Sequence, residues 1–249
     1  MRGNEMDVSC ICQTHGRPWL LAEAIESFRK QRLGPLTAEL IVVNDCEQQT
    51  IICDVPGVTI INTGWIPDVS RKSNFALEHC TGKAFCFWDD DDISLPDRIT
   101  DGVARMGSTY SYRPSICWHW GCGEILRMGQ PLIVSAFFDT AFVKSVGGCT
   151  VGAWNDKSLW DKLWPTGNVI QCQPKPADVH YIYRWAGIGW HESGNGEQDS
   201  GKRARDFHKA ALADPRFVAG EIRVEPKWKQ EYVAMAERAI RQGKGGIIR

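Results

Sequence analysis

Four adjacent aspartates, Asp89 to Asp92, are the strongest chemical feature of this 249-residue sequence. They follow an apolar run at residues 84–88, which is typical of a buried strand. Carboxylates a few ångströms apart raise one another's pKa, so such a run is most stable with a cation beside it. Mg²⁺ and Mn²⁺ prefer carboxylate oxygens and keep open positions for phosphate groups. A helix N-cap before Pro96 is an alternative, but capping needs only one of the four aspartates.

Strand and helix patterns alternate through the first part of the chain. The predicted strands cover residues 8–12, 39–43, 58–61 and 84–88. Three helices are predicted: one begins at Pro18, and the others cover residues 70–79 and 96–106. Such alternation predicts βαβ units and a mostly parallel sheet, in which ligands bind beyond the carboxyl ends of the strands. Because Asp45 and the aspartate run both follow strand patterns, we expect them to share one edge of the sheet.

The second half of the chain is less regular. Strand patterns occur at residues 116–120, 132–138 and 177–185, and helical patterns at 156–163, 202–212 and 228–241. A Gly/Ser/Asn-rich stretch at residues 192–201 is typical of a loop.

Composition and charge exclude several classes of protein. The net charge of -1 argues against a uniformly basic nucleic-acid-binding protein. From Asp199 onward the chain has 12 Lys/Arg against 7 Asp/Glu, so this basic tail could meet an anionic partner or simply be a solvated surface. No run of about 18 apolar residues predicts a membrane span. Ten cysteines without a CxxC pair predict mostly free thiols and a reducing, cytoplasmic compartment.

The aspartates belong to a longer pattern in which Gly82 precedes them and Pro96 follows. This pattern resembles the signature of family 2 glycosyltransferases, which have the GT-A fold. Four further segments are similar to elements of that family, in the same order: VSCICQTHGR at 8–17, LIVVND at 40–45, RKSN at 71–74, and Gly147-Gly148 followed by WNDKSLW at 154–160. Together they cover roughly residues 8–165. The chain departs from the family pattern at Asn155, where Glu is usual, and at Ser73, where many members have Arg.

The resemblance implies an α/β, GT-A (Rossmann-like) fold with a central, mostly parallel sheet flanked by helices and a C-terminal helical extension. Residues 1–195 would form the GT-A domain, with a nucleotide-binding half at 1–110 and an acceptor half at 111–195. Residues 196–249 would form a loop and the basic helical tail.

The resemblance also assigns roles around a Mn²⁺ or Mg²⁺ cofactor. Asp91 is expected to be a direct metal ligand, Asp92 a second ligand, and Asp89 a contact to the ribose or, through water, to the metal. Asp90 is grouped with the donor-binding residues, although it could also point away. His191 could complete the metal sphere, as a late histidine does in some GT-A enzymes, or could be structural.

The donor is expected to be a nucleotide sugar, of the UDP type. Asp45 would bind the uracil base, although an Asn-Asp pair at a strand end also makes turns. The other donor-binding candidates are Thr14 and Arg17 for base and phosphate, Arg71 or Lys72 for the diphosphate, and Asn74 for holding its loop.

Asp156 is the candidate general base in the segment that resembles the family's catalytic motif. It would take the acceptor proton as the hydroxyl attacks the anomeric carbon, so the product would be inverted. The alternative role of Asp156 is a helix N-cap.

Three alternatives stay open at the level of sequence. The acceptor could be a glycan, a protein or a modified DNA base, because the basic tail could track a phosphate backbone or contact anionic lipids peripherally. The aspartates could instead serve a metal-dependent phosphotransferase or nuclease. The third alternative is a non-catalytic nucleotide-binding module.

Overall fold

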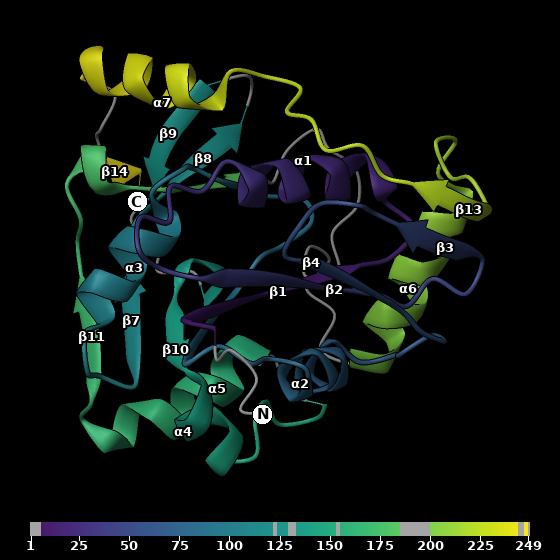
Figure 1. Cartoon of the computed structure of the whole chain (residues 1–249), viewed down its shortest axis with the longest axis horizontal. Helices are drawn as coiled ribbons and strands as arrows, with labels where there is room; N and C mark the ends of the chain where they lie inside the picture. The colour runs from purple at the N-terminus through teal and green to yellow at the C-terminus, as the bar shows by residue number, and fades with distance from the viewer. Residues whose placement is uncertain are drawn as a thin grey trace.

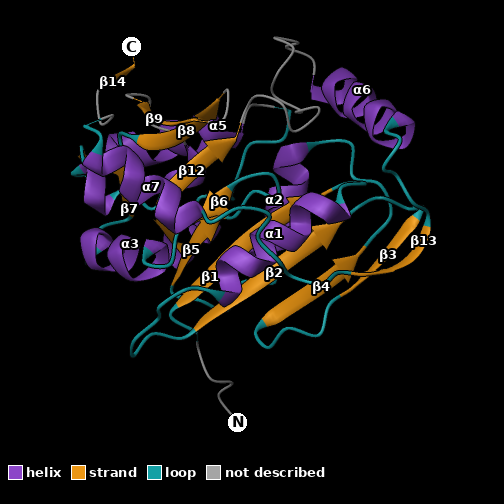
Figure 2. Cartoon of the chain, turned by 90° about the horizontal axis from the view of Figure 1, so that it is seen from above, coloured by secondary structure: helices purple, strands orange, loops and turns teal. Residues whose placement is uncertain are grey.

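The computed structural model describes residues 6–121, 124–128, 133–152, 155–184, 200–243 and 247–248. Figures 1 and 2 show the arrangement of its elements. The strands of the described part are β1 (Val8–Thr14), β2 (Ala38–Asn44), β3 (Gln49–Ile52), β4 (Val58–Asn62), β5 (Ala84–Phe87), β6 (Ile93–Ser94), β7 (Ser111–Pro114), β8 (Cys117–Gly121), β9 (Glu124–Met128), β10 (Phe137–Asp139), β11 (Val169–Cys172), β12 (Tyr181–Arg184), β13 (Gly220–Arg223) and β14 (Ile247–Ile248). The α-helices are α1 (Pro18–Arg29), α2 (Val69–Glu78), α3 (Arg98–Met106), α4 (Thr140–Ser145), α5 (Asn155–Leu163), α6 (Ser200–Ala213) and α7 (Tyr232–Arg241).

A seven-stranded sheet in the order β11-β7-β10-β5-β1-β2-β4 forms the centre of the protein. The strands β5, β1, β2 and β4 are parallel, whereas β10 runs antiparallel to both of its neighbours. The predicted α/β fold with a mostly parallel sheet is therefore confirmed. Because β5, β1 and β2 are adjacent and parallel, the loops that follow them meet at one edge, as the sequence predicted.

The central strands are buried on both faces, which is why they are nearly continuous apolar runs. Cys10 and Leu40 lie in the core cluster on one face, and Ile11 and Phe85 lie in the cluster on the other. Figure 1 shows α1 on one side of β1 and β2, and α2, α4 and α5 on the opposite side. The sheet is thus a middle layer between helices.

Gly82, at the start of the aspartate signature, lies where β5 enters the sheet. Its amide donates a hydrogen bond of 2.8 Å to Ser9 Oγ. A Cβ at this position would lie 2.4 Å from the backbone nitrogen of Ser9, so only glycine fits. The glycine therefore allows β5 to approach β1 closely enough to align the loop that carries the aspartates.

A second sheet, in the order β14-β9-β8-β12-β6, carries the later part of the chain. The third core cluster lies between this sheet and α7, and includes Ile93, Trp118 and Ile182 with Tyr232 and Ala236. Its edge strand β6 directly follows Asp92, so the aspartate run connects the two sheets. A two-stranded sheet of β3 and β13 lies beside the main sheet.

The structure corrects three of the predicted elements. Within residues 132–138, the described part forms a 3-10 helix at Ile133–Ser135 before β10. Within 177–185 the strand begins only at Tyr181, because the 3-10 helix Pro176–Asp178 precedes it. The last helix begins at Tyr232 rather than at residue 228. The predicted loop at 192–201 lies, up to residue 199, outside the described residues.

None of the described helices is long and apolar enough to cross a membrane.

Candidate active site

The candidate site lies where the loops after β1, β2 and β5 meet. Thr14, the last residue of β1, and His15, the first residue after it, reach separate acidic groups. The segment from Thr14 to Arg17, which leads into α1, is called the β1 loop. Thr14 donates from Oγ1 to Asp90 Oδ2 at 2.7 Å, and His15 Nδ1 lies 2.8 Å from Asp45 Oδ1. The β1 loop therefore connects the aspartate run to Asp45.

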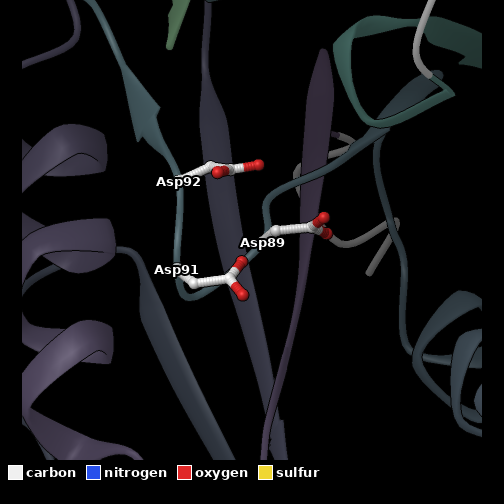
Figure 3. Close-up of side chains that lie close together, drawn as sticks. All are labelled: Asp89, Asp91 and Asp92. Atoms are coloured by element: carbon white, nitrogen blue, oxygen red, sulfur yellow. The ribbon is translucent and has the colours of Figure 1, made fainter. Parts of the chain in front are cut away.

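The loop between β5 and β6 brings three aspartate side chains together. Oxygens of Asp89, Asp91 and Asp92 lie within 4.8 Å of one another. Figure 3 shows that all three carboxylates project to the same side of the loop. The side chain of Asp89 makes no hydrogen bond to the described part of the chain, although its backbone carbonyl accepts from the Asp92 N–H at 3.4 Å. Its oxygens are therefore the most available of the three for a ligand.

Asp90 has a different environment from the three clustered aspartates. It is 1% exposed, and Arg17 Nε donates to its Oδ2 at 3.2 Å while Arg17 Nη2 donates to its Oδ1. Arg17 Nη1 also donates to Asp91 Oδ2 at 3.0 Å. Asp90 thus anchors the β1 loop through Thr14 and Arg17. It does not belong to the carboxylate cluster.

The protonation behaviour of the cluster shows a deficit of positive charge. Burial, followed by the charges of Asp91 and Asp90, raises the pKa of Asp89 to about 7. Burial, followed by the charges of Asp91 and Asp89, raises the pKa of Asp92 well above its usual range. A divalent cation would offset this repulsion, and carboxylate oxygens are the ligands that Mg²⁺ and Mn²⁺ prefer. The residues present therefore fit such a cation.

Strand β12 holds the aspartate loop from the second sheet. Tyr181 Oη donates to Asp92 Oδ2, and the backbone N–H of Arg184 donates to Asp92 Oδ1 at 2.7 Å. The side chain of Arg184 donates from Nε to the carbonyl oxygen of Asp91. The loop is fixed on one side by β1 and on the other by β12.

Asp45 is buried and engaged by the protein itself. It is 1% exposed, Lys72 Nζ donates to its Oδ1 at 2.5 Å, and the Ile66 N–H donates to its Oδ2 at 3.1 Å. Burial opposes ionisation, but the charges and hydrogen bonds of Lys72 and His15 outweigh it and lower the pKa of Asp45. A nucleobase would reach this carboxylate only after His15 or Lys72 moved.

Helix α6 covers this part of the site. Burial outweighs the hydrogen bond and charge of Asp45 and lowers the pKa of His15, and its Nε2 lies 2.8 Å from His208 Nδ1. The His208 ring stacks on Trp65 with ring centroids 5.0 Å apart and an interplanar angle of 27°. Phe207 lies under the Arg17 guanidinium, 5.1 Å from its ring centroid. Aromatic side chains of α6 therefore contact His15 and Arg17 and, beyond them, Trp65.

Two of the donor-binding candidates on α2 differ in exposure. Arg71 is exposed, whereas Asn74 is half-buried and binds the loop before α5. Asn74 Nδ2 donates to the Cys149 carbonyl at 2.8 Å, and the Cys149 N–H donates to Asn74 Oδ1 at 2.7 Å. Gly148 has φ +64°, and a Cβ there would lie 2.3 Å from Asn74 Oδ1. This glycine lets Asn74 approach the loop closely.

The sequence profile of the glycosyl transferase family 2 matches residues 9–112, which span β1 through part of β7. That segment holds Thr14, Arg17, Asp45 and the whole aspartate run. Residues 9–112 are thus similar to family 2 of the glycosyl transferases. No curated protein matches the chain.

Solved structures resemble this chain in fold. The structure of S. aureus TarS residues 1–349 in complex with UDP-GlcNAc has a TM-score of 0.61 and 14% identity, and covers 86% of this chain and 68% of its own. The mannosyltransferase PcManGT from Pyrobaculum calidifontis, in complex with GDP-Man and Mn²⁺, has a TM-score of 0.53 and 15% identity, and covers 72% of this chain and 57% of its own. At these identities the likeness shows the fold, and the predicted GT-A fold is confirmed.

Two of the predicted site residues lie outside the described side chains. Asp156 is in the first turn of α5, whose backbone is described, but its side chain is not. His191 lies outside the described residues altogether. The general base and the histidine ligand stay predictions.

Sequence reasoning missed several residues that contact the site. His15 could have been found, because it directly follows Thr14 after a strand pattern. Tyr181 and Arg184 could not, because they are 89 and 92 positions from Asp92 in the sequence. No local pattern connects two segments that far apart.

Proposed function

We propose that this chain is a metal-dependent, inverting glycosyltransferase that moves a sugar from a UDP-sugar to an acceptor hydroxyl. The observation that carries the proposal is the carboxylate cluster of Asp89, Asp91 and Asp92 at the edge where three parallel strands end. The TarS complexes with UDP-GlcNAc and UDP support a nucleotide-sugar donor, and PcManGT with GDP-Man and Mn²⁺ supports a divalent cation.

Asp89, Asp91 and Asp92 would hold the Mn²⁺ or Mg²⁺ ion, with His191 as a further proposed ligand. When bound, the ion would act as a Lewis acid on the leaving diphosphate. Arg17 adds a permanent positive charge beside Asp91, because Arg17 Nη1 lies 3.0 Å from Asp91 Oδ2. This charge partly neutralises the carboxylate cluster. It therefore favours the approach of an anionic donor.

The nucleotide would lie along the β1 loop, between the cation and Asp45. Trp65 offers an aromatic face for a base, and Asp45 and His15 offer hydrogen-bonding groups. His208 contacts both Trp65 and His15. Donor binding at this place therefore requires α6 to shift its aromatic residues.

Asp156 is proposed as the general base that accepts the proton of the acceptor hydroxyl. Helix α5 packs against α2 through the core cluster that contains Leu159 and Ala76, so its first turn has a fixed place beside the donor half of the sheet. We propose a glycan acceptor and a cytoplasmic site of action. The free thiols of the described cysteines support the latter.

A thermal-shift titration with nucleotides and metals tests the donor assignment. UDP, UDP-GlcNAc, GDP and GDP-Man are each added with EDTA, Mg²⁺ or Mn²⁺, and Tm is measured. A ligand at about 100 times its Kd stabilises the folded state by about 2.7 kcal/mol. We expect a Tm rise with the UDP compounds only when metal is present. The absence of a metal-dependent rise with every nucleotide would contradict the proposal.

The variant Asp156→Asn tests the proposed base. It is expected to keep the metal-dependent Tm rise with UDP-sugar and to lose most sugar transfer, since general base catalysis contributes about a hundredfold to ten-thousandfold. Asp161→Asn on the same helix, where Asp161 is exposed, is the matched control. Near-normal turnover in Asp156→Asn would remove the residue from the mechanism.

A further inference from the structure

Arg184 is, with Tyr181, one of two residues of β12 through which the second sheet holds the aspartate loop. Its N–H and Nε contact Asp92 Oδ1 and the Asp91 carbonyl, respectively. The side chain is buried, with only 3% of the residue exposed. Its orientation therefore decides where Asp91 and Asp92 lie relative to Asp89.

The guanidinium of Arg184 is in turn held by two residues far away in the sequence. Arg184 Nη1 donates to Glu23 Oε2 on α1 at 2.7 Å and to Tyr232 Oη on α7 at 3.2 Å. Glu23 and Tyr232 are 1% and 2% exposed. The charge of Arg184 is thus neutralised inside the protein, away from the donor.

The tail closes the arrangement on the side of α1. Tyr232 Oη donates to Glu23 Oε1 at 2.7 Å, and the Lys229 N–H donates to the same oxygen at 2.9 Å. Trp228 Nε1 donates to Ser27 Oγ, also on α1, at 2.9 Å. Figure 1 shows α7 lying beside β8 and β9 of the second sheet. The tail thus connects α1 with that sheet beside Arg184, the last residue of β12.

A closed set of buried hydrogen bonds of this kind fixes side-chain orientation. Residues that orient metal ligands commonly affect metal affinity even though they do not touch the ion. We propose that Glu23 and Tyr232 are positioning residues which, through Arg184, set Asp91 and Asp92 for cation binding. The C-terminal helix α7 is therefore part of the support of the active site. This inference rests on the proposed function of the aspartates as the metal site.

The alternative is that Tyr232 only attaches the tail to the body of the protein. Both roles lower Tm when the hydroxyl is removed, so stability does not distinguish them. Cation affinity does, because a tail anchor has no influence on the ligand oxygens once the protein is folded.

The decisive variant is Tyr232→Phe, which removes one hydroxyl from a buried site. Binding of Mn²⁺ in the presence of saturating UDP is measured from free Mn²⁺ by electron paramagnetic resonance, at a temperature well below Tm. We expect the Kd for Mn²⁺ to rise about tenfold, the lower end of the usual range for residues that orient ligands. The matched control is Tyr112→Phe, which removes another buried tyrosine hydroxyl, 3.6 Å from Cys172 Sγ in the main sheet. Its Kd for Mn²⁺ is expected to equal that of the wild type.

Glu23→Gln and the double variant with Tyr232→Phe extend the test. Because both residues act through Arg184, the double variant is expected to weaken Mn²⁺ binding by less than the product of the single effects. An unchanged Kd in Tyr232→Phe, or an equal loss in Tyr112→Phe, would overturn the positioning role.

Asp91→Asn separates the two proposals. If it abolishes Mn²⁺ binding while Tyr232→Phe has no effect, only the positioning role fails. If Asp91→Asn binds Mn²⁺ as the wild type does, the metal site itself is placed wrongly.

Discussion

His15 and His208 are 193 residues apart in the sequence, yet Nε2 of the first and Nδ1 of the second lie 2.8 Å apart. The contact joins the β1 loop to α6 at the place where a nucleobase is expected. His15 also binds Asp45, so the pair extends a chain of polar contacts from Lys72 through Asp45 to α6. Helix α6 would therefore compete with the proposed nucleotide donor for the same groups.

We predict that His208→Ala binds UDP more tightly than the wild type, by about threefold to tenfold, because α6 no longer has to be displaced from Trp65. Isothermal titration calorimetry with UDP and Mn²⁺ measures the change. Leu212→Ala, an exposed residue of the same helix, serves as the control. Weaker binding in His208→Ala would mean that His208 contacts the nucleotide instead of excluding it.

The placement of the candidate site could be predicted from the sequence because it depends on local patterns. Each strand pattern ends at a polar residue, and parallel pairing puts those ends at one edge. This pattern alone predicts that Asp45 and the Asp89–Asp92 run share one edge of the sheet.

The second sheet could not be predicted in the same way. Strands β6 and β14 have only 2 residues each, which is too short for periodicity to be recognised. The patterns at 116–120 and 177–185 overlap β8 and β12, but a strand pattern does not show which strands pair. The role of Arg184 depends on this sheet, and so do its contacts with Glu23 and Tyr232. These contacts connect three distant segments and are set by packing alone.

We predict that Asp89→Asn stabilises the protein in EDTA at neutral pH and abolishes its stabilisation by Mn²⁺ with UDP. The substitution removes a charge that desolvation and the neighbouring charges of Asp91 and Asp90 disfavour. Tm is expected to rise by at least about 2 °C, which corresponds to about 1 kcal/mol in a chain of this size. Asp97→Asn is the control of opposite sign, because Arg32 lies in hydrogen-bond contact with Asp97 and stabilises its charge. A lower Tm for Asp89→Asn would show that its carboxylate is satisfied without a cation.

Asp45→Asn is predicted to destabilise the protein strongly. The substitution leaves the buried ammonium of Lys72 without its carboxylate partner. Breaking one side of a buried ion pair costs about 3 kcal/mol or more. Urea unfolding measures the loss, and Asp54→Asn, in an exposed pair with Arg223, is expected to change little. An unaffected free energy of unfolding in Asp45→Asn would indicate that Asp45 is held for the donor alone.

The acid stability of the protein is predicted to depend on Glu23. Burial opposes its ionisation, but the charge of Arg184 and hydrogen bonds from Arg184, the Lys229 N–H and Tyr232 outweigh it and lower its pKa. The stabilising contribution is therefore present above the unfolded pKa of about 4.3 and is lost as pH falls through the lower folded pKa. At neutral pH, Glu23→Gln is expected to be less stable than the wild type by about 3 kcal/mol.

Thermal unfolding of the two proteins between about pH 3 and pH 7 tests this dependence. The gap in Tm should narrow as the pH falls below about 4. Glu225 is exposed, and Glu225→Gln is the control. Its Tm is expected to equal that of the wild type across this pH range. A gap that stays constant down to the lowest pH would contradict the assignment of the charge to Glu23.

Asn74 is predicted to affect turnover and not donor binding. Its amide makes two hydrogen bonds to Cys149, in the loop that leads to α5 and Asp156. Lys162 of α5 donates to the carbonyl of Gly148 in the same loop at 2.5 Å, so the loop and the helix move together. Asn74→Ala should therefore lower kcat by roughly tenfold to a hundredfold through misplacement of the proposed base, with the Kd for UDP unchanged. Ser145→Ala, which removes an exposed hydroxyl on α4, controls for a local loss of one hydrogen bond. A weaker Kd for UDP at full kcat would instead assign Asn74 to the donor, because a loop that only positions α5 has no contact with the nucleotide.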